Sequence, residues 1–476
     1  MQHHFRIMKS SERNDFRIRK ASAIVMPALL LLSVATAQAQ EAGQEVANAA
    51  EQETAVRYSV LYLEPAVPVS GEIDFELPPP GIPQSPELDP EFQERMQDIQ
   101  QFNESITDSE IMAGAWDNSL VEQLNSLGSL QQQQGDHLGA IETHERAIHV
   151  QRINSGLHTI EQTPLVGQMI DSYIAMGDWT QVDVYQNYLF YIQQKFYGNN
   201  DPRLIPALGD LANWHARAFT MRQGESLAMR LSSAQMLFKA AARMVEVHFG
   251  PDDDRYIEYL RGVARSAYLV ALNQDLLREL ARAQFRAPQE TLRDMLYWHF
   301  PIVPTGFRAG EDALLAIREF YMNREGEAEQ LAEATAQVAD WYLLFNRRAP
   351  ARDMYLEAWE AVAEEDNAEE LRRQLFGQVR EIPVFASDDN EWMVENMGFI
   401  ADVEEVVDYD HIDLRFDVTQ WGEVRNVVSI GESAPEAESQ HGWVRRAVRD
   451  SMFRPMLVDG ENVRSDGNLF RYRYWY

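Results

Sequence analysis

The sequence predicts a mostly α-helical protein in which a solenoid of helical repeats is followed by a small α+β module. Two observations indicate this fold class. Gly135-Asp136 and Gly156 recur 42 residues later as Gly177-Asp178 and Gly198, and helical periodicity fills both intervals. The last 67 residues, 410–476, instead alternate apolar and polar side chains on either side of one helical stretch. The repeats therefore predict stacked helix pairs, and the C-terminal end predicts a short sheet with one helix.

The first repeat has small and apolar residues where two antiparallel helices must approach closely. These are Leu124, Leu127, Gly128, Ala140 and Ala147. The Gly-Asp pair between the helices permits the chain to reverse, because glycine adopts backbone conformations that other residues disfavour. This pattern resembles the tetratricopeptide family in a longer, 42-residue form. The second unit keeps Tyr173, Val182 and Leu189 at the equivalent places.

Later repeats are less regular. The ending "YGNNDPR" of the second unit reappears 52 residues on as "FGPDDDR", which predicts about ten extra residues in the third unit, near 220–230. Residues 255–330 predict a divergent repeat plus a loop. A fourth clear unit carries Val338, Ala339, Tyr342, Ala351, Tyr355 and Ala358. The resemblance assigns 112–366 to the solenoid and implies a curved stack whose concave groove binds peptides or proteins.

The C-terminal module, 410–476, is predicted to fold as β-β-α-β. A hairpin turns at Trp421-Gly422-Glu423. The stretch "ESQHGWVRRAVRDSM" has helical spacing, with Trp443, Val444, Ala447 and Met452 on one apolar stripe. The alternating run "NLFRYRYWY" forms the last strand. A connecting segment, 367–409, separates this module from the repeats.

The order of motifs in this module resembles the C-terminal domain of the TonB family. The matching residues are Gly422, Val424 and Val427, then Phe453, Pro455 and Gly460. In that family a partner peptide pairs with the last strand. The resemblance therefore implies partner binding by Phe470, Arg471, Tyr472, Arg473, Tyr474 and Trp475. An open edge strand would accept the partner by backbone hydrogen bonds, while the aromatic face packs on the helix that carries Trp443.

Residues 1–39 predict a secretory signal peptide that is cut after Ala39. The alternative is an uncleaved membrane anchor, although the uninterrupted apolar stretch falls short of the ~20 residues that span a bilayer. Residues 40–111 predict an acidic, proline-containing leader and linker, with one possible strand that ends near Tyr62. TonB proteins that reach across the periplasm carry a much longer proline-rich spacer than the ~15 residues of "ELPPPGIPQSPELDP".

Composition excludes several functions. The chain has no cysteine, so disulfides, thiolate nucleophiles and cysteine-based zinc sites are excluded. Its net charge of -33 disfavours nucleic acid and anionic lipid as partners. Neither an H-E-x-x-H helix, a G-x-S-x-G elbow nor a phosphate-binding glycine loop occurs.

Two groups of residues invite a metal-binding interpretation. His137, His144, His149 and His158 lie close in sequence, but packing and surface roles fit their helix positions better. The acidic run in "PDDDR" (251–255) fits a helix cap better than a calcium site. We therefore expect no catalytic residues, no cofactor and no metal. An enzyme that uses only carboxylates and histidine remains a weaker alternative.

These observations predict a non-enzymatic periplasmic scaffold or adaptor of the cell envelope, with protein or peptide partners such as outer-membrane transporters. Membrane contact is expected only if the N-terminal segment is uncleaved. The alternative function is an energy transducer of the TonB type, anchored in the inner membrane and facing the periplasm.

Overall fold

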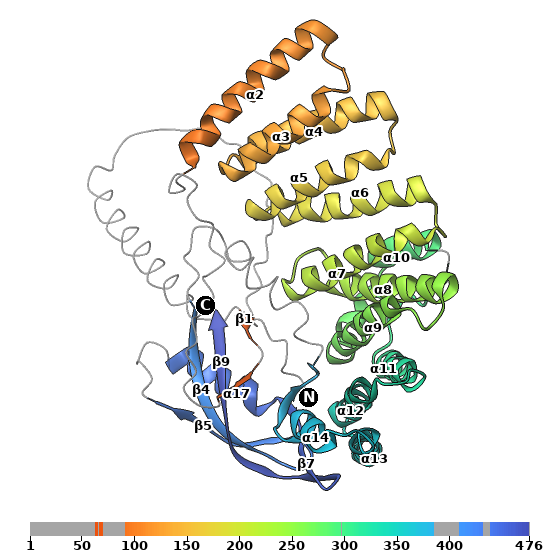
Figure 1. Ribbon diagram of the computed structural model, residues 1–476, viewed down its shortest axis with the longest axis vertical. Coiled ribbons are helices and arrows are strands. Elements are labelled where there is room, and N and C mark those ends of the chain that lie inside the picture. Colours follow the sequence, from red (N-terminus) through yellow and green to blue (C-terminus); the bar gives the residue numbers. More distant parts are fainter. Residues whose placement is uncertain are drawn as a thin grey trace, which may run out of the picture.

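The structure is a computed structural model that describes residues 62–64, 66–69, 91–296, 298–384, 409–431 and 438–475. Its helices form a long stack of antiparallel pairs, and an antiparallel sheet lies beside the last pairs (Figure 1). The predicted fold class, a mostly helical repeat solenoid followed by a small α+β module, is confirmed. The predicted signal peptide, 1–39, and the proline-rich stretch 76–90 lie outside the described residues. Among the residues described, no helix is long and apolar enough to cross a membrane.

The solenoid is built from successive pairs that pack against their neighbours. The pairs are α3 (Leu120–Gln133) with α4 (His137–Ser155), α5 (Thr163–Ala175) with α6 (Trp179–Tyr197), α7 (Ile205–Thr220) with α8 (Leu227–Phe249), α9 (Asp254–Leu272) with α11 (Phe307–Met322), and α12 (Ala328–Leu344) with α13 (Arg348–Ala361). Single turns of 3-10 helix, Ile160–Gln162 and Pro202–Leu204, connect the first pairs. A last helix, α14 (Ala368–Phe376), leads toward the sheet.

Aspartate marks the turn within each of the first two repeats, and glycine marks the end of each, as the sequence predicts. The Asp136 side chain accepts a hydrogen bond from the Gly139 amide at the start of α4, and Asp178 caps α6 in the same way. Each helix then ends at a glycine with positive φ, 102° at Gly156 and 87° at Gly198. Side-chain caps satisfy backbone N–H groups that a helix start leaves unpaired. The 42-residue period therefore has a structural basis in these caps.

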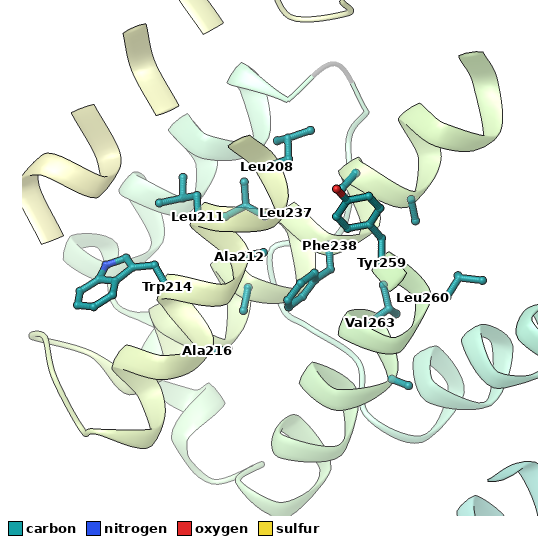
Figure 2. Close-up of a cluster of buried hydrophobic side chains, with 14 of the residues drawn as sticks. Leu208, Leu211, Ala212, Trp214, Ala216, Leu237, Phe238, Tyr259, Leu260 and Val263 are labelled. Carbon is teal, nitrogen blue, oxygen red and sulfur yellow. The ribbon is translucent and has the colours of Figure 1, made fainter. Parts of the chain in front are cut away.

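The extra residues of the third unit are distributed rather than inserted at one place. Helix α7 has 16 residues and α5 has 13, while α8 has 23 and α6 has 19. The connection 221–226 is also longer than 176–178. The longer helices bury a continuous apolar cluster between α7, α8 and α9, which includes Leu208, Leu211, Leu237, Phe238 and Val263 (Figure 2).

The divergent segment 255–330 forms a helix pair with an insertion. Helices α9 and α11 are the pair, and a 3-10 helix (Leu276–Ala281) and α10 (Ala283–Met295) lie between them in sequence. Both inserted elements pack against α8 rather than continuing the stack. This agrees with the predicted divergent repeat, and the predicted loop corresponds to the non-helical residues 298–306 before α11.

The helical region begins earlier than predicted. Helix α2, Phe92–Ala113, occupies the end of the segment assigned to a linker, and it packs on α3. Its only buried side chains are Arg95 and Ile106, so its sequence has little of the apolar stripe that identifies a helix. The boundary at residue 112 therefore falls at the end of a helix instead of before one.

The C-terminal module contains the predicted hairpin, helix and last strand, together with short additional strands. Its elements are β4 (Tyr409–Val418), β5 (Val424–Ile430), α17 (Glu438–Arg449), β6 (Met452–Arg454), β7 (Met456–Val458), β8 (Glu461–Val463) and β9 (Ser465–Trp475). The main sheet has the order β1-β9-β4-β5, with all neighbours antiparallel. Helix α17 ends at Arg449, so Met452, expected on its apolar stripe, lies in β6 instead.

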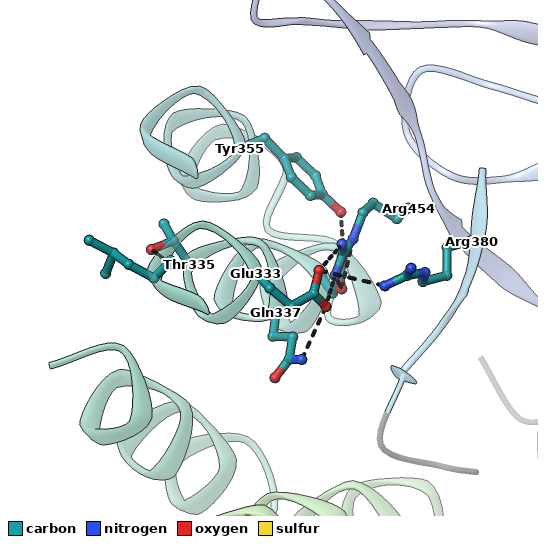
Figure 3. Close-up of polar contacts among 8 residues, drawn as sticks. Glu333, Thr335, Gln337, Tyr355, Arg380 and Arg454 are labelled. Atoms are coloured by element: carbon teal, nitrogen blue, oxygen red, sulfur yellow. Dashed lines mark hydrogen bonds and ion pairs between the residues drawn. The ribbon is translucent and has the colours of Figure 1, made fainter. Parts of the chain in front are cut away.

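A buried ionic cluster joins this module to the solenoid (Figure 3). Arg454 of β6 is fully buried and contacts Asp340 at 2.7 Å and Glu333 at 2.7 Å, both on α12. The hydroxyl of Tyr355 on α13 donates to Asp340 at 2.7 Å. Burial disfavours the charge of Glu333, but Arg454 outweighs this effect and lowers the pKa of Glu333. The module is therefore fixed to the last helix pair by a desolvated charge network.

Two glycines of the module allow its backbone to approach its neighbours closely. A Cβ atom on Gly422, whose φ is 75°, would overlap the carbonyl oxygen of Phe453 and lie 3.0 Å from Leu343 of α12. A Cβ atom on Gly460 would lie 2.8 Å from Leu356 of α13. Both glycines belong to the motif that resembles the TonB family. In this chain the absence of a side chain at these glycines lets the module pack closely against the solenoid.

Candidate protein-binding site

The last strand, β9, is not an open edge. It pairs with β4 on one side, and on the other side with β1 (Tyr62–Leu63) and β2 (Val67–Pro68) (Figure 1). The register places Leu63 opposite Tyr474 and Val67 opposite Arg471. The prediction of a free terminal edge is therefore wrong, because the chain's own leader already supplies the missing strand. The edge on the other side of the sheet is β5, whose outer side has no partner among the described strands.

Glu64 fixes the leader strand, which consists of β1 and β2, against β9. Its side chain is 3% exposed, and it forms an ion pair with Arg473 at 2.6 Å. The Trp475 indole N–H donates to the same carboxylate at 2.9 Å. The Glu64 amide also donates to the Arg473 carbonyl at 3.0 Å, and the Val69 amide donates to Leu469 at 3.0 Å. Backbone pairing and one buried carboxylate together define a site for a short extended segment.

Other predicted partner-binding residues also have internal contacts. The guanidinium of Arg471 makes a bidentate pair with Asp413 at 2.7 and 2.8 Å, and its hydrogen bonds lower the pKa of that carboxyl. Phe470, Tyr472 and Tyr474 are buried in one cluster with residues of α17, and Trp443 packs against it. The expectation that the aromatic face packs on this helix is confirmed. Partner binding by residues 470–475 stays a prediction, and it now requires displacement of the leader strand.

A second candidate site is a groove of about 750 Å³ in the solenoid. Helices α7, α9, α11 and α12 line it. Its guanidinium groups are those of Arg217 on α7, Arg261 and Arg265 on α9, and Arg324 in the turn between α11 and α12. Arg324 already contacts Asp254 at 2.8 Å and Glu327 at 3.4 Å. Arg217, Arg261 and Arg265 line the same groove, together with Glu258. Guanidinium groups recognise carboxylates in planar geometry, so the groove suits an acidic peptide.

The groove arginines could not be predicted from the sequence, because three of them occupy ordinary helix positions and Arg324 lies in a turn. Arg261 and Arg265 are four residues apart on α9, and Arg217 comes from α7. Their proximity depends on stacking of consecutive repeats. Glu64 was also missed, although it lies only two residues after Tyr62, where the expected strand ends.

The four neighbouring histidines do not converge. His144 is fully buried against Gly128 between α3 and α4, whereas His149 packs edge-on against Trp116 and His158 against Tyr191. In "PDDDR", Asp253 caps α9 and pairs with Arg255 at 2.7 Å, as the capping interpretation predicts. Within the described ranges, no group of three or more His, Cys, Asp or Glu side chains could hold a metal ion.

Comparisons with known proteins show only distant likeness. No protein-family model matches the chain, and no curated protein matches it. Among solved structures, BtubC (BKLC) from P. vanneervenii is 11% identical, with a TM-score of 0.34, covering 60% of this chain and 92% of that one. A putative kinesin light chain from P. anserina with TPR-like repeats is 14% identical, with a TM-score of 0.29, covering 54% and 97%.

Proposed function

We propose that this protein is a non-enzymatic scaffold of the cell envelope that binds protein partners at two places. One is the arginine-lined groove, which takes an acidic segment of a partner. The other is the outer side of β9, which takes an extended segment as an added strand. The observation that supports the proposal is the Glu64 anchor, in which an extended segment combines backbone pairing with one carboxylate opposite Arg473.

In this proposal the leader strand is a resident occupant that a partner replaces. A segment without a carboxylate at this place would leave Arg473 uncompensated, so we expect such a segment to bind much less tightly. A partner segment with a carboxylate at the equivalent place would make the same contacts. Tethering favours the chain's own strand through its high effective concentration. A partner segment therefore replaces the leader strand only if it binds β9 more tightly, or if the groove holds the partner nearby.

A labelled peptide with the sequence of residues 62–69, YLEPAVPV, tests strand replacement. It is titrated against the wild-type full chain and against Glu64→Gln, with binding followed by fluorescence anisotropy. We expect tighter binding to Glu64→Gln, because the weakened resident strand competes less well. The peptide YLQPAVPV serves as the matched control and should bind less tightly to both chains. Absence of YLEPAVPV binding to a folded Glu64→Gln chain would show that β9 does not accept a replacement strand.

We further propose that the chain is exported to the periplasm and that cleavage follows Ala39. The alternative, an energy transducer of the TonB type with an uncleaved anchor, predicts a different species in cells. Intact mass and fractionation separate the two. A soluble form that begins at Gln40 supports the scaffold, whereas a full-length form in the inner membrane supports the transducer.

A further inference from the structure

A larger cavity, distinct from both candidate sites, lies between α6, α7, α8 and α10. Its volume is about 960 Å³, within the range of ~300–1,000 Å³ typical of small-molecule sites. Its walls are mainly apolar and aromatic, and include Trp179, Phe190, Tyr191, Leu292 and Met295. The inserted helix α10 closes one side, where Gln194 of α6 donates a hydrogen bond to the Met295 carbonyl at 3.3 Å.

Three polar side chains meet at this cavity. Arg230 of α8 is 7% exposed and donates to Asp183 Oδ1 at 2.5 Å and to His215 Nδ1 at 3.1 Å. Its Nε donates to the Gln223 carbonyl at 3.1 Å, and Trp214 Nε1 donates to the same Asp183 oxygen at 2.8 Å. Arg230 is thus neutralised and held in place by three different elements.

The tautomer of His215 follows from this arrangement. An arginine N–H can only donate, so the Nδ1 atom must accept, and the proton of the neutral ring lies on Nε2. Burial, reinforced by the charge of Arg230, lowers the pKa of His215 to about 3, so the ring is neutral at pH 7. The side chain is 8% exposed.

Each of two groups at the cavity keeps one unused hydrogen-bonding atom. No described residue accepts a hydrogen bond from His215 Nε2–H. This nitrogen is not fully buried, so a ligand can reach it. The contacts of Asp183 go to Oδ1, which leaves Oδ2 without a donor among the described residues. His215 and Asp183 therefore present a donor and an acceptor at the cavity, whose lining also includes the polar side chains of Asn187, Glu225 and Gln289.

We propose that this cavity binds ligands with an apolar body and an amide group, whose carbonyl accepts from His215 Nε2–H and whose N–H donates to Asp183 Oδ2. A carboxylate would face the charge of Asp183 without offering a donor. An ammonium group would lie near Arg230 and could not accept from His215. An amide supplies both partners without adding charge. The amide can belong to a peptide segment or to a free small molecule, which share this chemistry.

Calorimetric titration of the full chain with matched probes tests the proposal. The probes are N-acetyl-leucyl-phenylalaninamide for a peptide source and 4-phenylbutyramide for a free amide. We expect at least one to bind, and its N,N-dimethyl or carboxylate counterpart to bind about tenfold more weakly, because one hydrogen bond is lost. Binding of the dipeptide alone identifies a peptide source, and binding of phenylbutyramide alone identifies a free amide. If neither amide binds, or the counterparts bind equally well, the proposal is overturned.

Variants locate the binding. Leu292→Trp fills the cavity from α10 and should abolish binding, whereas Asp294→Trp, on the same helix outside the cavity, should leave it unchanged. His215→Asn keeps an acceptor for Arg230 but removes the Nε2–H donor, so it should weaken binding about tenfold. Circular dichroism confirms that each variant is folded. Binding that survives Leu292→Trp would place the amide elsewhere and overturn the proposal.

Discussion

Glu64 and Arg473 are separated by almost the whole described chain, yet their charged groups lie 2.6 Å apart beside the last strand. The contact closes the polypeptide on itself, because the leader strand belongs to the same sheet as the C-terminal strand. It also explains why an arginine can face inward here, with 18% of its side chain exposed. Backbone pairing sets the register, and the carboxylate supplies the specificity.

Glu64→Gln should detach the leader strand. The change removes the charge opposite Arg473 and leaves that guanidinium poorly compensated, so we expect a loss of about 3 kcal/mol in the free energy of unfolding. Hydrogen exchange of the Val69 amide, which donates to Leu469, should become faster. Glu461→Gln, at an exposed glutamate of the same module, is the matched control and should alter neither quantity. Unchanged Val69 protection in Glu64→Gln would mean that the ion pair does not hold the strand.

Arg454→Met should loosen the module from the solenoid. Removal of the guanidinium leaves Asp340 buried without its counter-ion, which typically costs about 3–5 kcal/mol. Urea unfolding followed by circular dichroism measures this loss. Adding Asp340→Asn should restore part of the stability, because the uncompensated charge disappears. Arg352→Met, which breaks an exposed pair with Asp353, should cost no more than about 1 kcal/mol. Equal effects of the two arginine variants would contradict the importance of the buried cluster.

Gly422→Ala should be far more damaging than Gly467→Ala. Both residues have positive φ, 75° and 71°, so both variants carry the backbone cost of about 1–2 kcal/mol. Only at Gly422 would the new Cβ also overlap the Phe453 carbonyl, since nothing lies within 4 Å at Gly467. The difference between their thermal unfolding midpoints therefore isolates the steric effect. Similar midpoints would show that the hairpin turn can shift away from β6.

The features that the sequence predicted well are those encoded locally. Gly135-Asp136 and Gly177-Asp178 recur at the repeat spacing, and each aspartate caps a helix, so these pairs indicated both the fold and its period. Burial of Ala351, Tyr355 and Ala358 likewise followed from helical spacing. The hairpin around Gly422 needed only alternation and a turn residue.

The features that the sequence did not predict depend on pairing between distant residues. Trp475 and Glu64 are 411 positions apart, and the pattern that predicted a strand ending near Tyr62 could not say which strand it pairs with. Alternation in β9 could identify a strand but could not say how many neighbours it has. The groove arginines and the cavity at His215 arise only when repeats stack, so local patterns contain no sign of them.

Acidification should destabilise the protein through His144. Its side chain is fully buried, and burial lowers its pKa from 6.5 to about 4. The unfolded chain therefore takes up a proton below pH 6.5, whereas the folded protein resists protonation until about pH 4. The stability that the neutral ring contributes is complete above pH 6.5 and is lost as the pH falls toward 4. Between pH 7 and 4.5 this loss amounts to about 2 kcal/mol.

His144→Leu removes this titration while keeping an apolar side chain against Gly128. Urea unfolding at pH 7 and pH 4.5 should therefore show a smaller loss of stability for the variant than for the wild type, because every other titrating group is common to both. His149→Gln, at an exposed position of the same helix, should retain the full wild-type loss. Parallel losses in wild type and His144→Leu would mean that the ring is protonated in the folded repeat at little cost, in conflict with its burial and its unpaired ring nitrogens.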